Sequence, residues 1–243
     1  MRQCLFSILV LVATSTGIEA SCVDPSTLVR STVNLTRDFG EEERRVEPGV
    51  LGIRGTGWFL SPRLIVTAAH VADAMHLSAQ DWKEIEIKER DNQGSIPVRV
   101  LRVAGSRSEK IAVLELRAPF AGATVLQNRM RPLVPEERVI SLAYPGSELR
   151  FAGGRFVRYG DDDRFAGMAL LEMHDGNDRL VLDHGASGAP VLDCEGRVVA
   201  VVSTIITQTI NLLSSPVRVS TAWQTPNVVS IPIEVLKDFS WLE

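Results

Sequence analysis

The sequence lacks an excess of charge of either sign. Its 243 residues include 26 Lys and Arg against 30 Asp and Glu, which gives a formal net charge of −4 at pH 7. Such a balance supplies no basic field that would draw the chain onto nucleic acid or an anionic membrane. The 4 His residues also lack Cys or carboxylate neighbours at metal-ligand spacing, so we expect neither a metal nor a cofactor.

The sequence also lacks long apolar runs, and its apolar run near the N-terminus is short. Residues 5–13 follow a basic residue but cannot span a bilayer. This pattern, with the small residue Ala20 behind it, is typical of a secretory signal peptide. We therefore expect removal of residues 1–20 and a secreted or periplasmic mature chain without an integral membrane anchor. A lipoprotein signal using Cys22 is disfavoured because Glu19 stands where that signal has an aliphatic residue.

Cysteine is scarce, with 3 in the whole chain. Removal of the signal peptide takes Cys4 away and leaves Cys22 and Cys194, in a compartment that permits disulfides. One bridge between the N-terminal arm and the second half of the chain is one interpretation. Two unrelated thiols are the other, since a bridge requires Cα atoms within about 7 Å.

Short β-type runs separated by turn residues dominate the rest of the chain and form two groups. The first group comprises residues 50–53, 57–60, 64–68, 85–87, 97–103 and 111–116; the second comprises 138–143, 155–159, 168–173, 179–182, 190–192, 198–204 and 227–231. A proline-containing stretch without a sustained period separates the groups. We therefore expect an all-β fold of two six-stranded antiparallel β-barrels, with a short C-terminal helix over 232–242.

The expected divisions follow from this grouping. They are an N-terminal arm over 21–48, a first β-barrel over 49–118, an inter-barrel linker over 119–137, and a second β-barrel plus C-terminal helix over 138–243. The sequence carries no indication of oligomeric state.

Two short segments carry the candidate chemistry. The segment 185–190 reads Gly-Ala-Ser-Gly-Ala-Pro. A nucleophilic serine needs a turn that exposes its hydroxyl and aims amide hydrogens at a developing oxyanion, and flanking glycines permit that turn. His70 ends the segment Ile-Val-Thr-Ala-Ala-His. Taken alone, the first segment is more typical of an ordinary loop, and His70 is more typical of a half-buried histidine that caps a strand.

The conjunction of these segments, with Gly-Thr-Gly-Trp-Phe-Leu at 55–60, resembles the trypsin-like, chymotrypsin-fold serine peptidases. The resemblance is strongest to secreted bacterial members similar to the protease domain of HtrA-type peptidases, and it covers about residues 50–236. It implies a chymotrypsin-like double barrel with the site in the cleft between the barrels. On this resemblance His70 is the general base, Ser187 the nucleophile, and the amides of Gly185 and Ser187 form the oxyanion hole.

The third member of the triad is where the sequence departs from the family. The family pattern of Asp followed by alternating apolar residues places its carboxylate at position 110, which is Lys110 here. Side chains alternate along a strand, so Glu109 is expected on the opposite face from Lys110. Only a bulge adding one residue would turn Glu109 towards His70.

The resemblance also implies two substrate-binding positions. Val181, six residues before the nucleophile, would lie at the bottom of the specificity pocket and favour apolar side chains. Ser203 matches the strand that pairs with extended substrate backbone, although a plain core strand explains it nearly as well.

The expected function is a secreted serine endopeptidase that hydrolyses a protein or peptide substrate through an acyl-enzyme on Ser187. The alternative is a catalytically inactive pseudoprotease that binds a peptide or protein in the cleft between the barrels. Lys110 favours the alternative, whereas the intact His70 and Ser187 segments favour catalysis. An esterase of the same fold is a third, minor interpretation.

Overall fold

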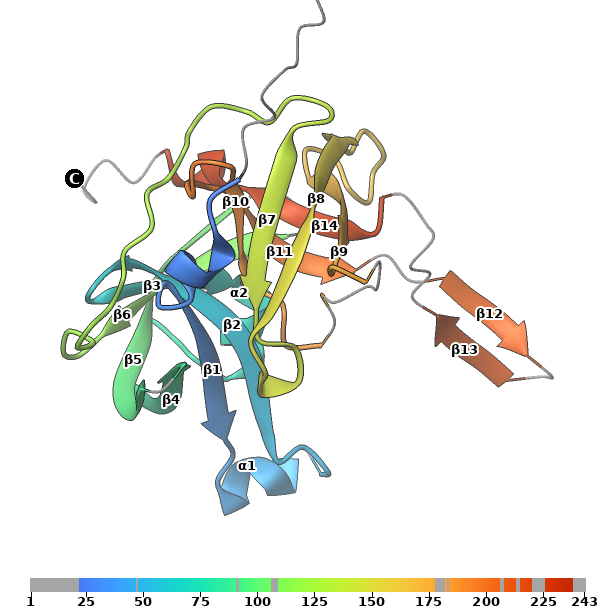
Figure 1. Ribbon diagram of the computed structural model, residues 1–243. Helices are drawn as coiled ribbons and strands as arrows, with labels where there is room; N and C mark the ends of the chain where they lie inside the picture. The colour runs from blue at the N-terminus through green and yellow to red at the C-terminus, as the bar shows by residue number, and fades with distance from the viewer. Residues whose placement is uncertain are drawn as a thin grey trace, which may run out of the picture.

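Two closed β-barrels make up the molecule (Figure 1). The computed structural model describes residues 22–46, 48–90, 92–105, 109–177, 182, 184–205, 208–212, 215–219 and 226–237. The expected signal peptide, 1–20, therefore lies outside the described residues. The prediction of an all-β, chymotrypsin-like double barrel of six-stranded antiparallel barrels is confirmed.

Each barrel closes by pairing its strands in a fixed order. The first barrel runs β1 (Thr32–Asp38), β2 (Gly52–Ser61), β3 (Leu64–Ala68), β6 (Lys110–Leu116), β5 (Asn92–Gly105) and β4 (Lys83–Glu89). The second runs β10 (Pro190–Asp193), β11 (Val198–Ile205), β14 (Val228–Pro232), β9 (Ala169–His174), β8 (Arg150–Tyr159) and β7 (Arg138–Ala143). A hairpin of β12 (Gln208–Leu212) and β13 (Ser215–Val219) projects from the second barrel in Figure 1.

The helices are short. They are the helices α1 (Glu41–Val46) and α2 (Ala69–Ala74) and the 3₁₀ turns η1 (Pro25–Leu28), η2 (Pro145–Ser147) and η3 (Ile233–Leu236). The expected C-terminal helix thus begins as a single 3₁₀ turn, and its residues after 237 lie outside the described part. None of the helices in the described ranges is long and apolar enough to cross a membrane.

The first barrel differs from the sequence-based prediction at its N-terminal edge. The expected strands 50–53 and 57–60 are one continuous strand, β2. The sixth strand is instead β1, which lies inside the segment expected to be an arm outside the barrel and pairs with both β2 and β4. In the second barrel, the expected strand at 179–182 falls almost wholly outside the described residues.

Successive residues along the strands of the first barrel pack alternately into two different hydrophobic clusters. Phe59, Ile65 and Leu114 point into the first barrel. Their strand neighbours, including Trp58 and Val66, pack instead against apolar residues of the second barrel. Period-2 alternation therefore both fills one barrel and joins it to the other, which fixes the two barrels against each other at the cleft.

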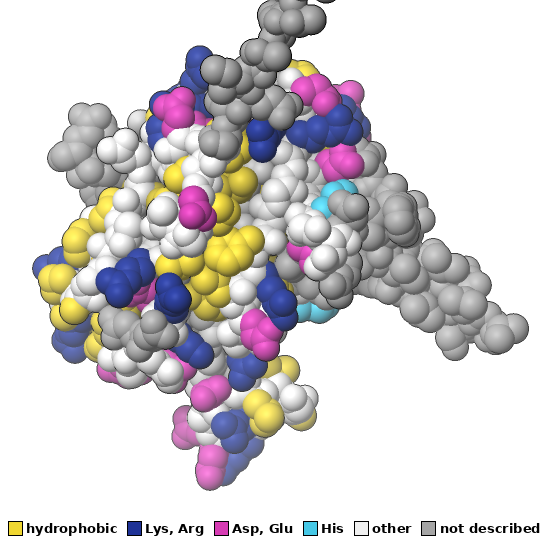
Figure 2. Space-filling view, in the orientation of Figure 1, with side chains coloured by type: hydrophobic (Ala, Val, Ile, Leu, Met, Phe, Trp, Pro, Cys, Tyr) yellow, Lys and Arg dark blue, Asp and Glu magenta, His cyan; other side chains and the backbone are white. Residues whose placement is uncertain are grey.

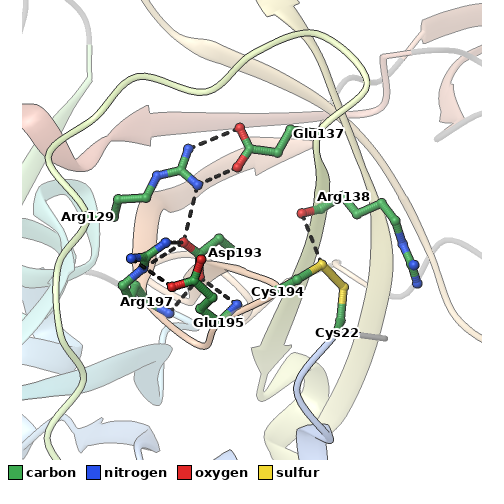
Figure 3. The surroundings of a disulfide bond; sticks show 8 residues. All are labelled: Cys22, Arg129, Glu137, Arg138, Asp193, Cys194, Glu195 and Arg197. Atoms are coloured by element: carbon green, nitrogen blue, oxygen red, sulfur yellow. Dashed lines mark hydrogen bonds and ion pairs between the residues drawn. A yellow bond between two sulfur atoms is a disulfide. The ribbon is translucent and has the colours of Figure 1, made fainter. Parts of the chain in front are cut away.

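The N-terminus of the described chain is tied to the second barrel. Cys22 and Cys194 form a disulfide, which decides between the two interpretations of these cysteines, and the amide of Val23 donates to the carbonyl of Cys194 at 3.0 Å. Figure 3 shows this bridge beside a group of charged side chains in which Arg129 pairs with Glu137 and with Asp193. The linker is thereby held to the end of β10.

Charged side chains of both signs are interspersed on the face shown in Figure 2. Basic and acidic groups alternate along its edges, and hydrophobic side chains occupy its middle. This face carries no field of a single sign.

Candidate active site

His70 stands at the first turn of α2, directly after β3. Strand β3 pairs with β6, and the last pair of this register joins Ala68 to Ile111. The end of β3 and the start of β6 therefore lie side by side. This register brings His70 next to the residues that precede β6.

The residue that faces His70 is Glu109. Its Oε2 lies 3.8 Å from Nδ1 of His70, a distance longer than that of a hydrogen bond. The same oxygen accepts a hydrogen bond from Oγ of Ser203. The imidazole of His70 is the main influence that lowers the pKa of Glu109; burial opposes it, and the Ser203 hydroxyl reinforces it. Glu109 is therefore held as a carboxylate beside His70.

Lys110, expected at the third position of the triad, has an exposed side chain. The expectation that Glu109 points away from His70 is wrong, and the packing of β6 explains why. Ile111 and Val113, which share the face of Glu109 along the chain, pack in the cluster between the barrels. That face, rather than the one of Lys110, is directed to the second barrel and its Ser203.

Ser187 lies in a tight turn between two glycines of positive φ, 98° at Gly185 and 92° at Gly188. A Cβ on Gly188 would come within 2.0 Å of the carbonyl oxygen of Thr56, so only glycine fits there. The hydroxyl of Ser187 donates to the carbonyl of Ser203 at 2.9 Å. Within the described residues, no hydrogen bond joins Ser187 to His70.

The peptide unit that carries the amide of Gly185 is held in one orientation. The carbonyl of His184 accepts a hydrogen bond from the amide of Gly146 at 3.1 Å. Carbonyl and amide point in opposite directions in a trans peptide unit, so the N–H of Gly185 points away from Gly146.

The peptide unit that carries the amide of Ser187 is held in the same way. The carbonyl of Ala186 accepts from the amide of Ala189 at 3.0 Å, which directs the N–H of Ser187 the other way. Neither the amide of Gly185 nor that of Ser187 donates to another described residue. Both donors are therefore available to an oxygen bound at the turn.

A cleft of about 460 Å³ between the two barrels adjoins this turn. Its lining comes from β1 and β2 on one side and from the loops around Gly146 and Gly185 on the other; the residues are Asp38, Leu51, Gly52, Ile53, Arg54, Gly146, His184 and Gly185. The location agrees with a site between the barrels and next to the candidate oxyanion donors.

The structure therefore brings together His70, Ser187, Gly185 and Ser203 from distant parts of the sequence. It adds Glu109, which the sequence predicts beside His70 only if a bulge adds one residue. The adjacent carboxylate was the available signal. Val181 lies outside the described residues, so its place in a specificity pocket stays a prediction.

A chymotrypsin-like double barrel with a histidine, a serine turn and a carboxylate at the barrel junction defines the class of trypsin-like peptidases. The family comparison agrees, because the trypsin-like peptidase domain matches residues 55–201. The chain belongs to this family. No curated protein matches the sequence.

Solved structures of peptidases share the fold. The Rv3671c protease from M. tuberculosis in its active form superimposes with a TM-score of 0.57 at 16% identity, over 88% of this chain and 80% of that chain. Its inactive form gives 0.57 at 17% identity, over 88% and 89%. The HtrA-type protease AlgW, solved with a tripeptide, gives 0.57 at 15% identity, over 90% of this chain and 62% of that one. The resemblance to HtrA-type protease domains is confirmed at the level of the fold.

Proposed function

We propose that this protein is a serine endopeptidase in which Ser187 is the nucleophile, His70 the general base and Glu109 the carboxylate that orients His70. The observation that carries the proposal is the contact of 3.8 Å between Glu109 and His70. It supplies the negative charge that stabilises an imidazolium and favours one imidazole tautomer. Lys110 does not remove this charge, because its exposed side chain extends into solvent.

The chemistry is acyl transfer. Oγ of Ser187 attacks the carbonyl carbon of the peptide bond while Nε2 of His70 accepts the hydroxyl proton. The carbonyl oxygen becomes an oxyanion that the amides of Gly185 and Ser187 stabilise. His70 then gives its proton to the leaving amine as the peptide C–N bond breaks. In the second half His70 accepts a proton from water, which attacks the acyl carbon; the bond from this carbon to Oγ of Ser187 breaks, and His70 returns the proton to Oγ.

One movement precedes the attack. The hydroxyl of Ser187 leaves the carbonyl of Ser203 and turns towards His70. This is a change of one side-chain rotamer, and it exchanges one neutral hydrogen bond for another, so the expected cost is about 1 kcal/mol. The freed carbonyl on β11 then becomes an acceptor for the backbone of an extended protein or peptide substrate.

We also infer that the chain is exported and that its first 20 residues are a signal peptide. The Cys22–Cys194 disulfide supports this, because structural disulfides persist in oxidising compartments. Mass spectrometry of the protein recovered from outside the cytoplasm tests the cleavage site: a mature N-terminus at Ser21 supports the inference, and an intact Met1 contradicts it.

A catalytically inactive binding protein of the same fold is the second candidate. The observation in its favour is the hydroxyl of Ser187, which donates to Ser203 rather than to His70. In that case the cleft of about 460 Å³ would hold a peptide or protein without cleaving it.

Labelling of the mature protein with a fluorescent fluorophosphonate distinguishes the two candidates. We expect wild type to label and Ser187→Ala not to label. Glu109→Gln is expected to slow labelling severely, because an amide in place of the triad carboxylate costs about 10⁴ in a trypsin-like enzyme. Lys110→Gln is the matched control from the next position, and its rate should stay within about threefold of wild type, as for an exposed substitution.

The other outcomes are equally informative. If wild type fails to label, the binding protein replaces the peptidase. Lys110→Asp, which places a carboxylate at the family's triad position, is labelled in parallel. If only this variant labels, Lys110 is the residue that inactivates the protein. A Glu109→Gln variant that labels like wild type would show that Glu109 has no part in orienting His70.

A further inference from the structure

Thr56 on β2 connects the first barrel to the serine turn of the second through several hydrogen bonds. Its side chain is fully buried. Oγ1 donates to the carbonyl of Gly185 at 2.6 Å and accepts from the amide of Tyr144 at 3.0 Å. The backbone amide of Thr56 donates to the carbonyl of Ser187 at 2.9 Å. One residue of the first barrel thus binds both residues that carry the candidate oxyanion amides.

The backbone of Thr56 is itself anchored inside the first barrel. Its carbonyl accepts a hydrogen bond from Oγ1 of Thr67 on β3 at 2.7 Å, and both threonines are fully buried. Thr67 precedes His70 by three residues in the sequence. This hydrogen bond therefore joins Thr56, which binds the serine turn, to the segment that leads to His70.

The bonds to Thr56 complete the set of acceptors in the serine turn. The carbonyls of His184 and Ala186 are held by Gly146 and Ala189, and those of Gly185 and Ser187 are held by Thr56. With every carbonyl from 184 to 187 bound to a donor, none of these peptide units turns over without losing a hydrogen bond. Gly146 and Ala189 hold the units that carry the amides of Gly185 and Ser187, and Thr56 holds the unit that follows each of them, so Thr56 restrains these amides through the neighbouring peptide units.

We propose that Thr56 is a positioning residue for the oxyanion hole, which sets the direction of the Gly185 and Ser187 amides towards a tetrahedral oxyanion. The inference rests on the proposed peptidase function. Thr56 touches neither substrate nor the reacting atoms, so it acts through the turn. Its hydroxyl is the part that matters, since the backbone bond to Ser187 survives any side-chain substitution except proline.

Thr56→Val tests the hydroxyl with little change of shape. It leaves the carbonyl of Gly185 without its donor and the amide of Tyr144 without its acceptor. We expect kcat to fall about 10- to 100-fold with KM within about twofold, less than the 10²–10³ that loss of an oxyanion donor itself costs. Affinity for a peptide boronic acid, which forms a tetrahedral anion on Ser187, should fall by about the same factor as kcat. Thr56→Ser keeps the hydroxyl and should restore both quantities.

Thr32→Val is the matched control. Thr32 is a fully buried threonine on the neighbouring strand β1, and its hydroxyl makes no hydrogen bond to any described residue. It should leave kcat and boronate affinity unchanged. If Thr56→Val does not fold, Thr56→Cys replaces it, and its kcat and boronate affinity are compared with those of Thr56→Ser. A thiol is similar in shape to the serine hydroxyl but is a weak hydrogen-bond donor.

Crystal structures of the variants separate this inference from the proposed function. The peptide unit between Gly185 and Ala186, whose carbonyl Thr56 binds, should keep its orientation in wild type and Thr56→Ser and lose it in Thr56→Val. Unchanged kcat, boronate affinity and peptide orientation in Thr56→Val would overturn the inference. If wild type neither cleaves peptides nor binds the boronate, the peptidase function fails, and the peptide orientation alone decides whether Thr56 controls the turn.

Discussion

The hydroxyl of Ser203 on β11 donates a hydrogen bond to the carboxylate of Glu109, which precedes β6. This bond crosses from the second barrel to the first and ends on the oxygen that faces His70. Ser203 is buried, so water does not readily replace its hydroxyl. The bond therefore fixes the carboxylate in the position where it can orient the imidazole.

We predict that Ser203→Ala lowers kcat by about tenfold and leaves KM nearly unchanged. A hydrogen bond to a charged group contributes about 1.5–3 kcal/mol, and part of this loss should appear in the transition state. The backbone carbonyl, the candidate substrate acceptor, remains in place. Steady-state kinetics on a peptide substrate give both constants.

Ser230→Ala is the control for this prediction. Ser230 is a fully buried serine on β14 whose register partner is Val202, and its hydroxyl has no hydrogen-bond partner among the described residues. Its removal should not change kcat. Equal activity of both variants would mean that Glu109 needs no support from Ser203.

Most of the fold could be predicted from the sequence because strand alternation and turn residues are local signals. The strand β1 was missed because it is largely polar: only Val33 and Leu35 alternate within it, while Thr32 and Asn34 are buried all the same. Its membership of the barrel depends on pairing with both β2 and β4, which a local pattern does not contain.

The site was predictable only in part, for a similar reason. His70 and Ser187 lie in segments that are recognisable in one dimension. Glu109 lies beside His70 because its face of β6 is directed to the second barrel. Thr56 contacts the serine turn through a hydrogen bond to Gly185, which is 129 positions away in the sequence. Both contacts are products of tertiary packing, so the sequence located Thr56 within the segment 55–60 and Glu109 next to position 110 without indicating either contact.

The buried Arg129 should contribute strongly to stability. Its side chain is 7% exposed and is paired with Glu137 and with Asp193, which is 4% exposed. Arg129→Gln removes the cation that pairs with Glu137, whereas Asp193 keeps its pair with Arg197. We therefore expect the loss of charged hydrogen bonds to cost about 1.5–3 kcal/mol. Chemical denaturation should show this fall in the free energy of unfolding.

Arg155→Gln provides the comparison for Arg129. Arg155 also pairs with two carboxylates, those of Glu136 and Glu172, but its side chain is 45% exposed. Solvent screening limits such pairs to about 0–1 kcal/mol. A loss in Arg155→Gln as large as that in Arg129→Gln would contradict the argument from burial.

Reduction of the Cys22–Cys194 disulfide should destabilise the fold. The bridge closes a loop with a sequence separation of 172 residues. Cross-linking so distant a pair restricts the unfolded chain, and the typical effect is about 2–4 kcal/mol. Thermal unfolding of wild type with and without a reductant measures it. The double variant Cys22→Ser/Cys194→Ser should unfold like the reduced protein and show no response to reductant; a response there would point to another cause.

Glu43 on α1 should make the stability of the protein depend on pH. Burial acts to raise its pKa, but the hydrogen bonds from Arg37 and from the amide of Gly40, with the contact to His76, lower that pKa from 4.5 to about 2. A carboxyl group with a lowered pKa in the folded state stabilises the protein above its unfolded pKa, and this stabilisation is lost as pH falls towards the folded pKa. The loss should therefore fall between about pH 4.5 and pH 2.

Glu43→Gln tests this dependence. At pH 7 the variant should be less stable than wild type by about 1 kcal/mol, the usual size for a partly exposed ion pair. The difference should shrink as the pH is lowered from 4.5 to 2. Urea denaturation across this range measures it, with Glu41→Gln as the control, because Glu41 is 90% exposed and pairs only loosely with Arg45 at 3.9 Å. A difference that stays constant down to pH 2 would show that the amide disturbs packing rather than charge, since protonation of Glu43 would then have no effect.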